Sequence, residues 1–251
     1  MKENTMKLIK EFTSRGLPLG LFCAGAMSIS GTATAEMQWN DFSLSYLSGS
    51  QYEVGDKSRQ FLTVEHASGH NWGDTFFFYD RSKSKDGTIE GYSELSPRLS
   101  LGYVSGSDLS FGIVSDVFIA STWEQGASFD NYLLGLGVSL NVPGFNYFTA
   151  NVYQANNSAW DNDQMMTITW GYPFKLAGAD FLYDGFLDWS NSSDSQASEM
   201  NFTSQLKYNV GGALGTKAPV YLGLEYAVWN NKFGISGVDE RSASFLLKWH
   251  F

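Results

Sequence analysis

The sequence predicts an all-β protein that crosses a membrane as a single closed antiparallel barrel. Side chains alternate between apolar and polar with a period of two from Met37 to the last residue. Aromatic residues make up 16% of the chain although its mean hydropathy is slightly negative, a combination typical of strands with one lipid face and one wet face. Beyond the amino-terminal segment, no stretch reaches the roughly 18 apolar residues of a spanning helix. Any membrane crossing must therefore use strands.

The first 35 residues have the composition of a cleavable export signal. Four basic residues, among them Lys2 and Arg15, accompany the mostly apolar stretch 17–29, and Ala33-Thr34-Ala35 fits an A-x-A cleavage site. The apolar stretch is shorter than the about 20 residues that a membrane-spanning helix needs. We therefore expect residues 1–35 to be a signal peptide and residues 36–251 to form one barrel domain.

The charge balance excludes some classes of partner. The chain holds 26 acidic and 16 basic residues, and the predicted signal takes four of the basic but only two of the acidic ones. The remaining acidity argues against nucleic-acid binding, which needs a basic surface. It also argues against a protein that binds anionic lipid surfaces through Lys and Arg.

The carboxyl-terminal strand shows the alternation most clearly. Its apolar face ends with Trp249 and Phe251, while its polar face carries serines, Lys248 and His250; Leu246 is the one exception. A terminal Phe that closes such an alternation resembles the signature by which outer-membrane proteins are recognised for assembly. The resemblance implies that the barrel-assembly machinery contacts the strand ending at Phe251.

Eleven further segments show the same alternation, which gives twelve predicted strands. An even number is what a bacterial single-chain barrel needs when both termini lie in the periplasm. Each segment is close to the 9–11 residues that cross a bilayer at a tilt. The predicted strands are 38–48, 58–67, 74–80, 89–103, 108–119, 131–141, 146–155, 164–174, 180–189, 200–210, 220–229 and 242–251.

The links between these strands sort by length. Links on the extracellular side of such a barrel should be long and those on the periplasmic side short. Ser105-Gly106-Ser107 and the Pro-Gly segment 142–145 are tight-turn compositions on the periplasmic side, where 211–218 is the one long exception. A soluble β-sandwich also alternates, but its links need not sort in this way. The predicted extracellular links, of roughly eight to eleven polar residues each, are 48–57, 81–88, 120–130, 156–163, 190–198 and 230–240.

If the apolar faces meet lipid, the polar faces must line an interior. The alternative is an aromatic-rich soluble core. Tyr and Trp near strand ends suit the aromatic girdles at the two membrane interfaces. The girdle candidates are Tyr103, Trp170, Tyr172, Trp189 and Trp249.

Alternation predicts an acidic interior. A narrow pore with more carboxylates than bases favours cations and neutral polar solutes over anions. Each inward charge could instead belong to an ion-pair network of the wall. The predicted inward charges are Glu65, Glu90, Glu94, Asp116, Asp184, Asp188 and Glu225 against Arg98, Lys207 and Lys248.

Inward aromatic residues could stack a base or the face of a sugar, while nearby carboxylates accept hydrogen bonds from hydroxyl or amino groups. Such stacking contributes about 1–3 kcal/mol per base. The alternative for each ring is packing within the wall. The candidates are Phe61, Tyr153, Phe186, Tyr221 and Trp229.

Several short motifs carry a resemblance to a known family. They are Ser96-Pro97-Arg98-Leu99-Ser100, Asp108-Leu109-Ser110-Phe111-Gly112, Leu134-Gly135-Leu136-Gly137 and Ala150-Asn151-Val152-Tyr153-Gln154. In order and spacing the chain resembles the nucleoside-specific channel-forming proteins of the bacterial outer membrane, one branch of which serves as phage-receptor porins. The resemblance implies a monomeric twelve-stranded barrel whose narrow pore binds nucleosides in series, between aromatic and ionisable residues.

Enzymatic chemistry is not expected. Ser204 and Lys207 match S-x-x-K, but residues three apart on a strand point to opposite faces. The three histidines, His66, His70 and His250, are predicted at the periplasmic end, away from loops in which an active site could open. The loop segment 161–163 lacks the glycine and distal glutamate of a dedicated calcium site. No metal or cofactor is expected.

Two functions remain open. The first is passive diffusion of small polar solutes, with nucleosides as candidates, through a barrel embedded in outer-membrane lipid. The second is a surface receptor or structural barrel with a plugged interior, whose extracellular loops bind phage or another cell. Twelve strands give a bore between filled eight-stranded barrels and open sixteen-stranded porins, so strand number alone does not decide.

Overall fold

A computed structural model of the chain describes residues 35–251. The predicted signal peptide lies outside the described residues, apart from Ala35. No helix among the described residues is long and apolar enough to cross a membrane.

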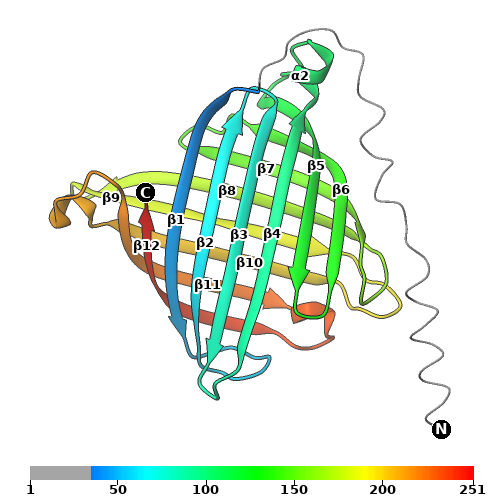
Figure 1. The fold of residues 1–251 in the computed structure, drawn as a ribbon, viewed down its shortest axis with the longest axis vertical. Helices are drawn as coiled ribbons and strands as arrows, with labels where there is room; N and C mark the ends of the chain where they lie inside the picture. The colour runs from blue at the N-terminus through cyan, green and yellow to red at the C-terminus, as the bar shows by residue number, and fades with distance from the viewer. Residues whose placement is uncertain (1–34) are drawn as a thin grey trace. The chain divides into compact units, whose positions relative to one another are not determined.

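The described residues form the predicted barrel of twelve antiparallel strands. Each strand pairs with the next along the chain, and β12 pairs with β1 to close the wall. Figure 1 shows β1 to β5 crossing in front of β8 to β12, with the red β12 beside the blue β1. The strands are β1 (Met37–Gly49), β2 (Arg59–His70), β3 (Gly73–Ser84), β4 (Ile89–Ser100), β5 (Val114–Gly126), β6 (Asp130–Leu140), β7 (Tyr147–Asn156), β8 (Gln164–Leu176), β9 (Ala179–Ser190), β10 (Glu199–Asn209), β11 (Val220–Asn230) and β12 (Glu240–His250).

We call the end where β1 begins and β12 ends the terminal mouth, and the opposite end the loop mouth. Three short helices lie in the links: α2 (Leu101–Ser105) and η1 (Gly211–Leu214) at the terminal mouth, and η2 (Lys232–Gly234) at the loop mouth. The helix η2 therefore lies in the link that leads into β12, the strand that closes the barrel by pairing with β1.

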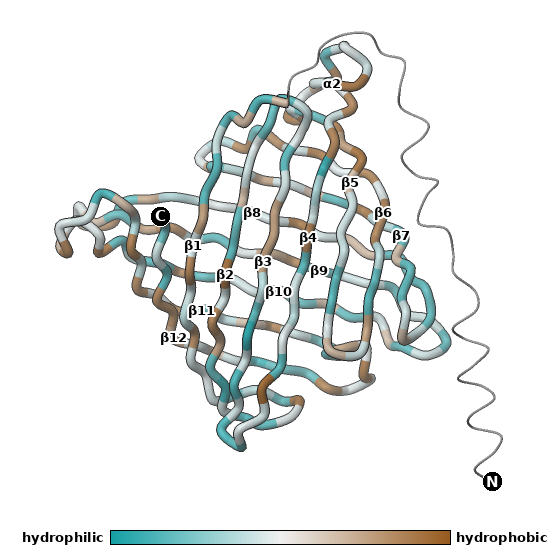
Figure 2. The backbone as a smooth tube through the Cα atoms, in the orientation of Figure 1, coloured by the Kyte–Doolittle hydropathy of each residue, from teal (hydrophilic) through white to brown (hydrophobic). Residues whose placement is uncertain are grey.

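Burial alternates along β12 with the predicted period of two. Figure 2 shows hydrophilic and hydrophobic residues interspersed along the strands of the wall. On β12, Ser244, Leu246 and Lys248 are buried, while Phe245 and Trp249 are exposed. Leu246, the predicted exception, is fully buried on the inner face. The exposed face is apolar and the buried face is largely polar, the reverse of a soluble protein and the arrangement expected of a wall between lipid and a polar interior.

Side chains on the outer face supply part of the predicted girdles. Tyr172, Trp189 and Trp249 are exposed on the wall. Trp170 is only 7% exposed because it packs against Tyr183 and Phe202. The prediction for Tyr103 was wrong, since this residue lies in α2 and not at the end of a strand.

Three predicted link lengths were also wrong. The link from β4 to β5 is not a tight turn at 105–107: Ser100 caps α2 by accepting a hydrogen bond from the Tyr103 amide, Gly106 ends the helix in the left-handed conformation, and β5 begins only at Val114. At the loop mouth, β3 continues to Ser84 and β5 to Gly126, so the links there are shorter than predicted. Hydrogen bonds to the neighbouring strands extend β3 and β5 through mostly polar residues. The sequence of these extensions shows no regular alternation between apolar and polar side chains.

Close backbone packing requires glycine at one point of the wall. A Cβ atom on Gly135 of β6 would lie 1.8 Å from the carbonyl oxygen of Val152 on β7. Any side chain there would force the two strands apart. The glycine therefore permits the close approach of β6 and β7 where Gly135 pairs with Tyr153.

Candidate functional site

Arg98 on β4 contacts side chains of strands on either side of β4 near the terminal mouth. Its Nε and Nη2 atoms donate to the two carboxylate oxygens of Asp74 at 2.8 and 2.6 Å, and Nη1 and Nη2 also donate to Asn151 and Ser139. The guanidinium carbon lies 4.4 Å from the centre of the Phe118 ring. These partners come from β3, β5, β6 and β7, so the side chains meet inside the barrel.

Two lysines form buried ion pairs on the same inner face. Lys248 Nζ lies 2.5 Å from Glu65, which also accepts hydrogen bonds from Ser43 and Ser45. Lys207 Nζ lies 2.5 Å from Asp184, and the side chain of Lys207 is 1% exposed. A positive charge is therefore buried here only together with a carboxylate partner, which offsets the cost of removing it from water.

Nearer the loop mouth, three inner carboxylates have no such partner. Glu94 on β4 lies directly across from Glu124 on β5, and Asp188 on β9 accepts a hydrogen bond from Thr167 at 2.6 Å. Within residues 35–251, no Lys, Arg or His forms an ion pair with any of the three. Unlike Glu65 and Asp184, these three acids of the interior therefore have no basic partner.

Near Glu94, five aromatic rings form a continuous series, which we call the aromatic ladder. Successive ring centres are 5.9, 5.7, 6.1 and 5.2 Å apart. The ladder starts on the inner faces of β3 and β4 and ends in the links at the loop mouth. It consists of Phe76, Phe78, Tyr92, Phe129 and Trp160.

Polar groups lie beside the ladder. The Tyr92 hydroxyl donates to Glu94 at 2.7 Å, and the ring of Phe129 lies over Gly126, where a Cβ atom would come within 2.3 Å of it. A flat solute that stacked on these rings would therefore have carboxylate oxygens within reach of its edge.

A cluster of side chains fastens two links together at the loop mouth; we call it the loop clasp. Lys232 of η2 pairs with Glu240 at 2.7 Å, and their side chains are only 6% and 1% exposed. The Lys232 ammonium lies 4.2 Å from the centre of the Trp229 ring and 5.7 Å from that of Tyr52. The Tyr52 hydroxyl is hydrogen-bonded to Ser244 at 2.8 Å. The clasp thus ties the links 50–58 and 231–239 across the seam where β12 meets β1.

Burial changes the titration of two clasp residues that lie in the links. Loss of water raises the pKa of Tyr52 to about 12, despite the hydrogen bond to Ser244. The same effect lowers the pKa of Lys232, and the Glu240 carboxylate opposes it.

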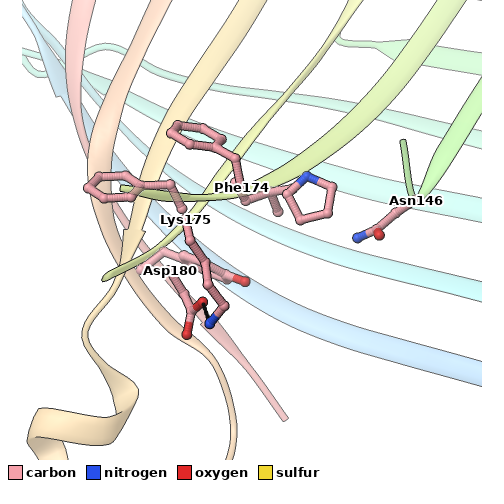
Figure 3. Close-up of a pocket in the computed structure, with 8 residues that line it drawn as sticks. Asn146, Phe174, Lys175 and Asp180 are labelled. Atoms are coloured by element: carbon pink, nitrogen blue, oxygen red, sulfur yellow. Dashed lines mark hydrogen bonds and ion pairs between the residues drawn. The ribbon is translucent and has the colours of Figure 1, made fainter. Parts of the chain in front are cut away.

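Two pockets open at the terminal mouth. One has a volume of about 350 Å³ and lies beside the hairpin between β8 and β9, where Lys175 and Asp180 form an exposed ion pair at 2.5 Å (Figure 3). Asn146 lines it from the link between β6 and β7, and Tyr221 lines it from β11. The other, of about 340 Å³, includes Asp116 together with the Arg98 partners Asp74 and Ser139.

The sequence model of a family described as nucleoside-specific channel-forming protein, Tsx, matches residues 34–244. The chain belongs to this family. The predicted membership of the Tsx family is thereby confirmed, and because the family is one of channels, the prediction of a protein that is not an enzyme agrees with it.

Individual relatives of this Tsx-family chain are distant. The outer membrane protein OmpK of Vibrio parahaemolyticus is 28% identical over 130 residues, which cover 49% of each chain. OmpK of Vibrio parahaemolyticus serotype O3:K6 (strain RIMD 2210633) is 26% identical over 155 residues, or 54% of this chain and 58% of the relative. The chain spans about half the length of the curated relatives it matches. These relatives and the family place the protein in the bacterial outer membrane, as predicted.

A solved structure shares the fold. The KdgM porin superposes with a TM-score of 0.51 at 9% sequence identity, over 84% of this chain and 99% of the porin. At this identity the likeness extends to the barrel fold alone.

The cross-strand register places every site residue predicted from sequence on the inner face of this Tsx-family barrel. Most of the charged candidates gather into the groups described above, whereas Glu225 accepts a hydrogen bond from Gln205 at 2.8 Å. The predicted aromatic residues, in contrast, are dispersed: Phe61 packs against Tyr52, Trp229 belongs to the loop clasp, and Tyr153 lies in a buried cluster with Leu133. The predicted residues are Phe61, Glu65, Glu94, Arg98, Asp116, Tyr153, Asp184, Phe186, Asp188, Lys207, Tyr221, Glu225, Trp229 and Lys248.

Sequence reasoning missed the aromatic ladder. Tyr92 lies two residues before Glu94, which was predicted on the inner face, so the same alternation predicts that Tyr92 also faces inward. On the neighbouring strand β3, Phe78 pairs directly with Glu94. Phe129 and Trp160 lie in links, where no periodic signal exists.

Features that could have suggested an enzyme or a metal site have other roles. Ser204 faces Tyr226 on the outer face while Lys207 is buried inside, so the S-x-x-K pair is divided by the wall. In the loop, Asp161 and Asp163 accept hydrogen bonds from Ser195 and Asn157. Among the described residues, no group of three or more His, Cys, Asp or Glu could hold a metal ion.

Proposed function

We propose that the barrel is a passive outer-membrane channel for small polar solutes and that nucleosides are its preferred cargo. The feature that supports this proposal most is the aromatic ladder with unpaired carboxylates along its edge, in a chain of the Tsx family. No cofactor or energy source is needed for movement down a gradient.

The chemistry of a nucleoside suits both parts of this surface. Its base can stack on the rings of the ladder, a contact that contributes about 1–3 kcal/mol per base. Its sugar hydroxyls and exocyclic amino groups can donate to Glu94, Glu124 and Asp188. Because these acids have no basic partner, a nucleotide phosphate would meet repulsion, so the channel should prefer nucleosides to nucleotides.

The dispersed aromatic residues extend the proposed route. Phe186 lies on the inner face of β9, two residues from Asp188, and Tyr221 lines the pocket at the terminal mouth. We propose that Phe186, Tyr221 and Trp229 contact solute before or after the ladder. Arg98, Lys207 and Lys248 are engaged with carboxylates and would act mainly as wall elements.

We also propose the orientation expected for such a barrel, with the terminal mouth in the periplasm and the loop mouth outside the cell. A chain of this kind would act as a monomer. Phage, if they attach, would meet the loop mouth, and the assembly machinery would meet β12 and Phe251. Accessibility of single cysteines in the links to an impermeant label on intact cells tests the orientation.

Planar-bilayer recording of the refolded protein tests the channel. Adenosine or thymidine should interrupt the current, whereas the corresponding monophosphate should do so much more weakly. Phe78→Ala should weaken nucleoside block about tenfold, since one stacking contact is lost. Phe77→Ala is the matched control, because Phe77 is the neighbouring residue on the outer face. Equal block in both variants would refute the role of the ladder.

The same recording addresses the second hypothesis. Refolded protein that inserts but conducts no current would favour a plugged receptor or structural barrel. Replacing Trp229 and Phe186 with Ala should also weaken block, and unchanged block would remove these two residues from the proposed route.

A further inference from the structure

The basic residues of the barrel are distributed unevenly. Six of them form ion pairs with carboxylates, and these are Arg59, Arg98, Lys175, Lys207, Lys232 and Lys248. Among the other described bases, Arg241 donates to backbone oxygens and to Asn230, and Lys217 lies at the terminal mouth. The remaining four gather at the loop mouth beside β2 and β3. They form what we call the basic patch: Lys57, Arg81, Lys83 and Lys85.

The centre of the patch projects from the outer face of the wall. Arg81 lies across from Leu62, and Lys83 lies across from Gln60 on β2 and Ile89 on β4. The residues between them on β3 face inward: Ser82 is buried, and Asp80 hydrogen-bonds Thr63 inside the barrel. Arg81 and Lys83 therefore point away from the proposed solute route.

Their depth in the membrane follows from the residues that precede them on the same face. The outer face of β3 carries Phe77, then Tyr79, then Arg81 and Lys83. Tyr79 is 40% exposed and its ring lies over Gly91, where a Cβ atom would meet the hydroxyl at 2.9 Å. An aromatic residue of this kind marks the edge of the hydrocarbon. At about 3.4 Å per residue along a tilted strand, Arg81 and Lys83 reach roughly 5 and 10 Å beyond that edge, at the level of lipid headgroups.

The acids near the patch form no ion pair with its bases, although Asp56 lies close enough to Lys85 to interact with it electrostatically. Asp56 accepts the backbone amides of Ser58 and Asp86 at 2.9 and 2.8 Å, which, together with Lys85 and Arg59, hold the pKa of its carboxyl below the ordinary value. Glu90 lies on the inner face and pairs with Arg59. Within residues 35–251, the Lys57, Arg81, Lys83 and Lys85 side chains make no ion pair within 4 Å and donate no hydrogen bond.

We propose that the basic patch binds the phosphate groups of an anionic glycolipid in the membrane leaflet at the loop mouth. Acyl chains of such a lipid would lie against Phe77 and Tyr79, and its phosphates would meet Arg81 and Lys83 directly above. A guanidinium can bind phosphate through two parallel hydrogen bonds, and the ammonium adds a point charge. The net acidity of the sequence argues against binding of anionic lipid through Lys and Arg. The fold makes one part of the surface locally basic, because it brings Lys57, Arg81, Lys83 and Lys85 to the same mouth without ion-pair partners. The inference depends on the outer-membrane location and not on solute transport.

Binding of purified lipid A to the refolded barrel in detergent tests the proposal. Affinity is measured by native mass spectrometry with lipid A that carries both phosphates and with its dephosphorylated form. The double variant Arg81→Gln/Lys83→Gln should bind the phosphorylated lipid about 30-fold more weakly, corresponding to ~1 kcal/mol for each base near a charged surface. The control variant Lys175→Gln/Lys217→Gln makes the same change of charge at the terminal mouth and should bind as the wild type does.

Three results would overturn the proposal. Equal affinity for phosphorylated and dephosphorylated lipid would show that the acyl chains alone are recognised. An equal loss in both double variants would indicate an effect of net charge. Competition by inorganic phosphate at concentrations close to those of the lipid would assign the patch to a free anion. Gel mobility of the folded barrel before and after heating identifies any variant that fails to fold, and the single variants Arg81→Gln and Lys83→Gln then replace it.

Discussion

Removing the positive charge of the loop clasp should destabilise the barrel by an amount that can be worked out from its contacts. Lys232→Met keeps the length of the side chain but leaves Glu240, 1% exposed, without its cation. Breaking a buried ion pair in this way costs about 3–5 kcal/mol. Glu240 keeps hydrogen bonds from the Glu53 amide at 2.9 Å and the Ser242 hydroxyl at 3.0 Å, so we expect a loss near the lower limit, about 3 kcal/mol.

The double variant separates charge from packing. Lys232→Met combined with Glu240→Gln removes both charges but keeps a side-chain oxygen as an acceptor at position 240, and its free energy of unfolding should lie within about 1 kcal/mol of the wild type, because no buried charge is left without a partner. The free energy of unfolding is measured by reversible urea denaturation in lipid vesicles, with tryptophan fluorescence as the signal. Lys175→Met is the control: its ion pair with Asp180 is 74% and 59% exposed, and its loss should cost less than about 1 kcal/mol. If Lys232→Met costs no more than this control, the clasp does not depend on its buried charge.

Three further predictions concern other parts of the wall. Below pH 10.0 the Tyr52 hydroxyl is protonated in both the folded and unfolded states, and burial raises its pKa in the folded state to about 12. The free energy of unfolding should therefore fall as the pH rises from 10 to 12, because only the unfolded state loses the proton in that range. Tyr52→Phe should remove this part of the fall, which urea denaturation at alkaline pH measures. Arg98→Lys cannot keep both bonds to Asp74 together with those to Asn151 and Ser139, and should lower stability by about 1–3 kcal/mol, whereas Arg81→Lys on the outer face should leave it unchanged. Gly135→Val should reduce the yield of folded barrel on gels because of its clash with the Val152 carbonyl, while the same change at the open turn residue Gly212 should be tolerated.

Much of this fold could be predicted because the lipid imposes a strict rule on every second residue. Ser244 and Lys248 on one face of β12 and Phe245 and Trp249 on the other were assigned correctly from alternation alone. The ends of strands were harder. Beyond the hydrocarbon, β3 and β5 continue as ladders of polar residues, and neither period nor hydropathy marks where they stop. The helix α2 was missed because its five residues are too few to show a helical period.

The interior was only partly predictable for a related reason. Alternation tells which side of the wall a residue occupies, so Glu94 and Asp188 were found, but it does not tell which residues from distant strands meet. The pairing of Lys248 with Glu65 crosses β1, and Arg98 meets Asn151 across two intervening strands. Contacts of this kind depend on the shear and curvature of the closed wall, which no single strand encodes.

The pairing of the first strand with the last has a consequence for how the protein can be made. The strands β1 and β12 each need the other as a hydrogen-bonding partner, in addition to the strand next to them in the sequence. Until they pair, each has one edge of free amide and carbonyl groups that hydrocarbon cannot solvate. Insertion therefore cannot proceed strand by strand to a stable partial sheet in the bilayer. A chain truncated before β12 has two open edges, on β1 and on β11. We therefore expect it to be degraded and not to form a smaller pore.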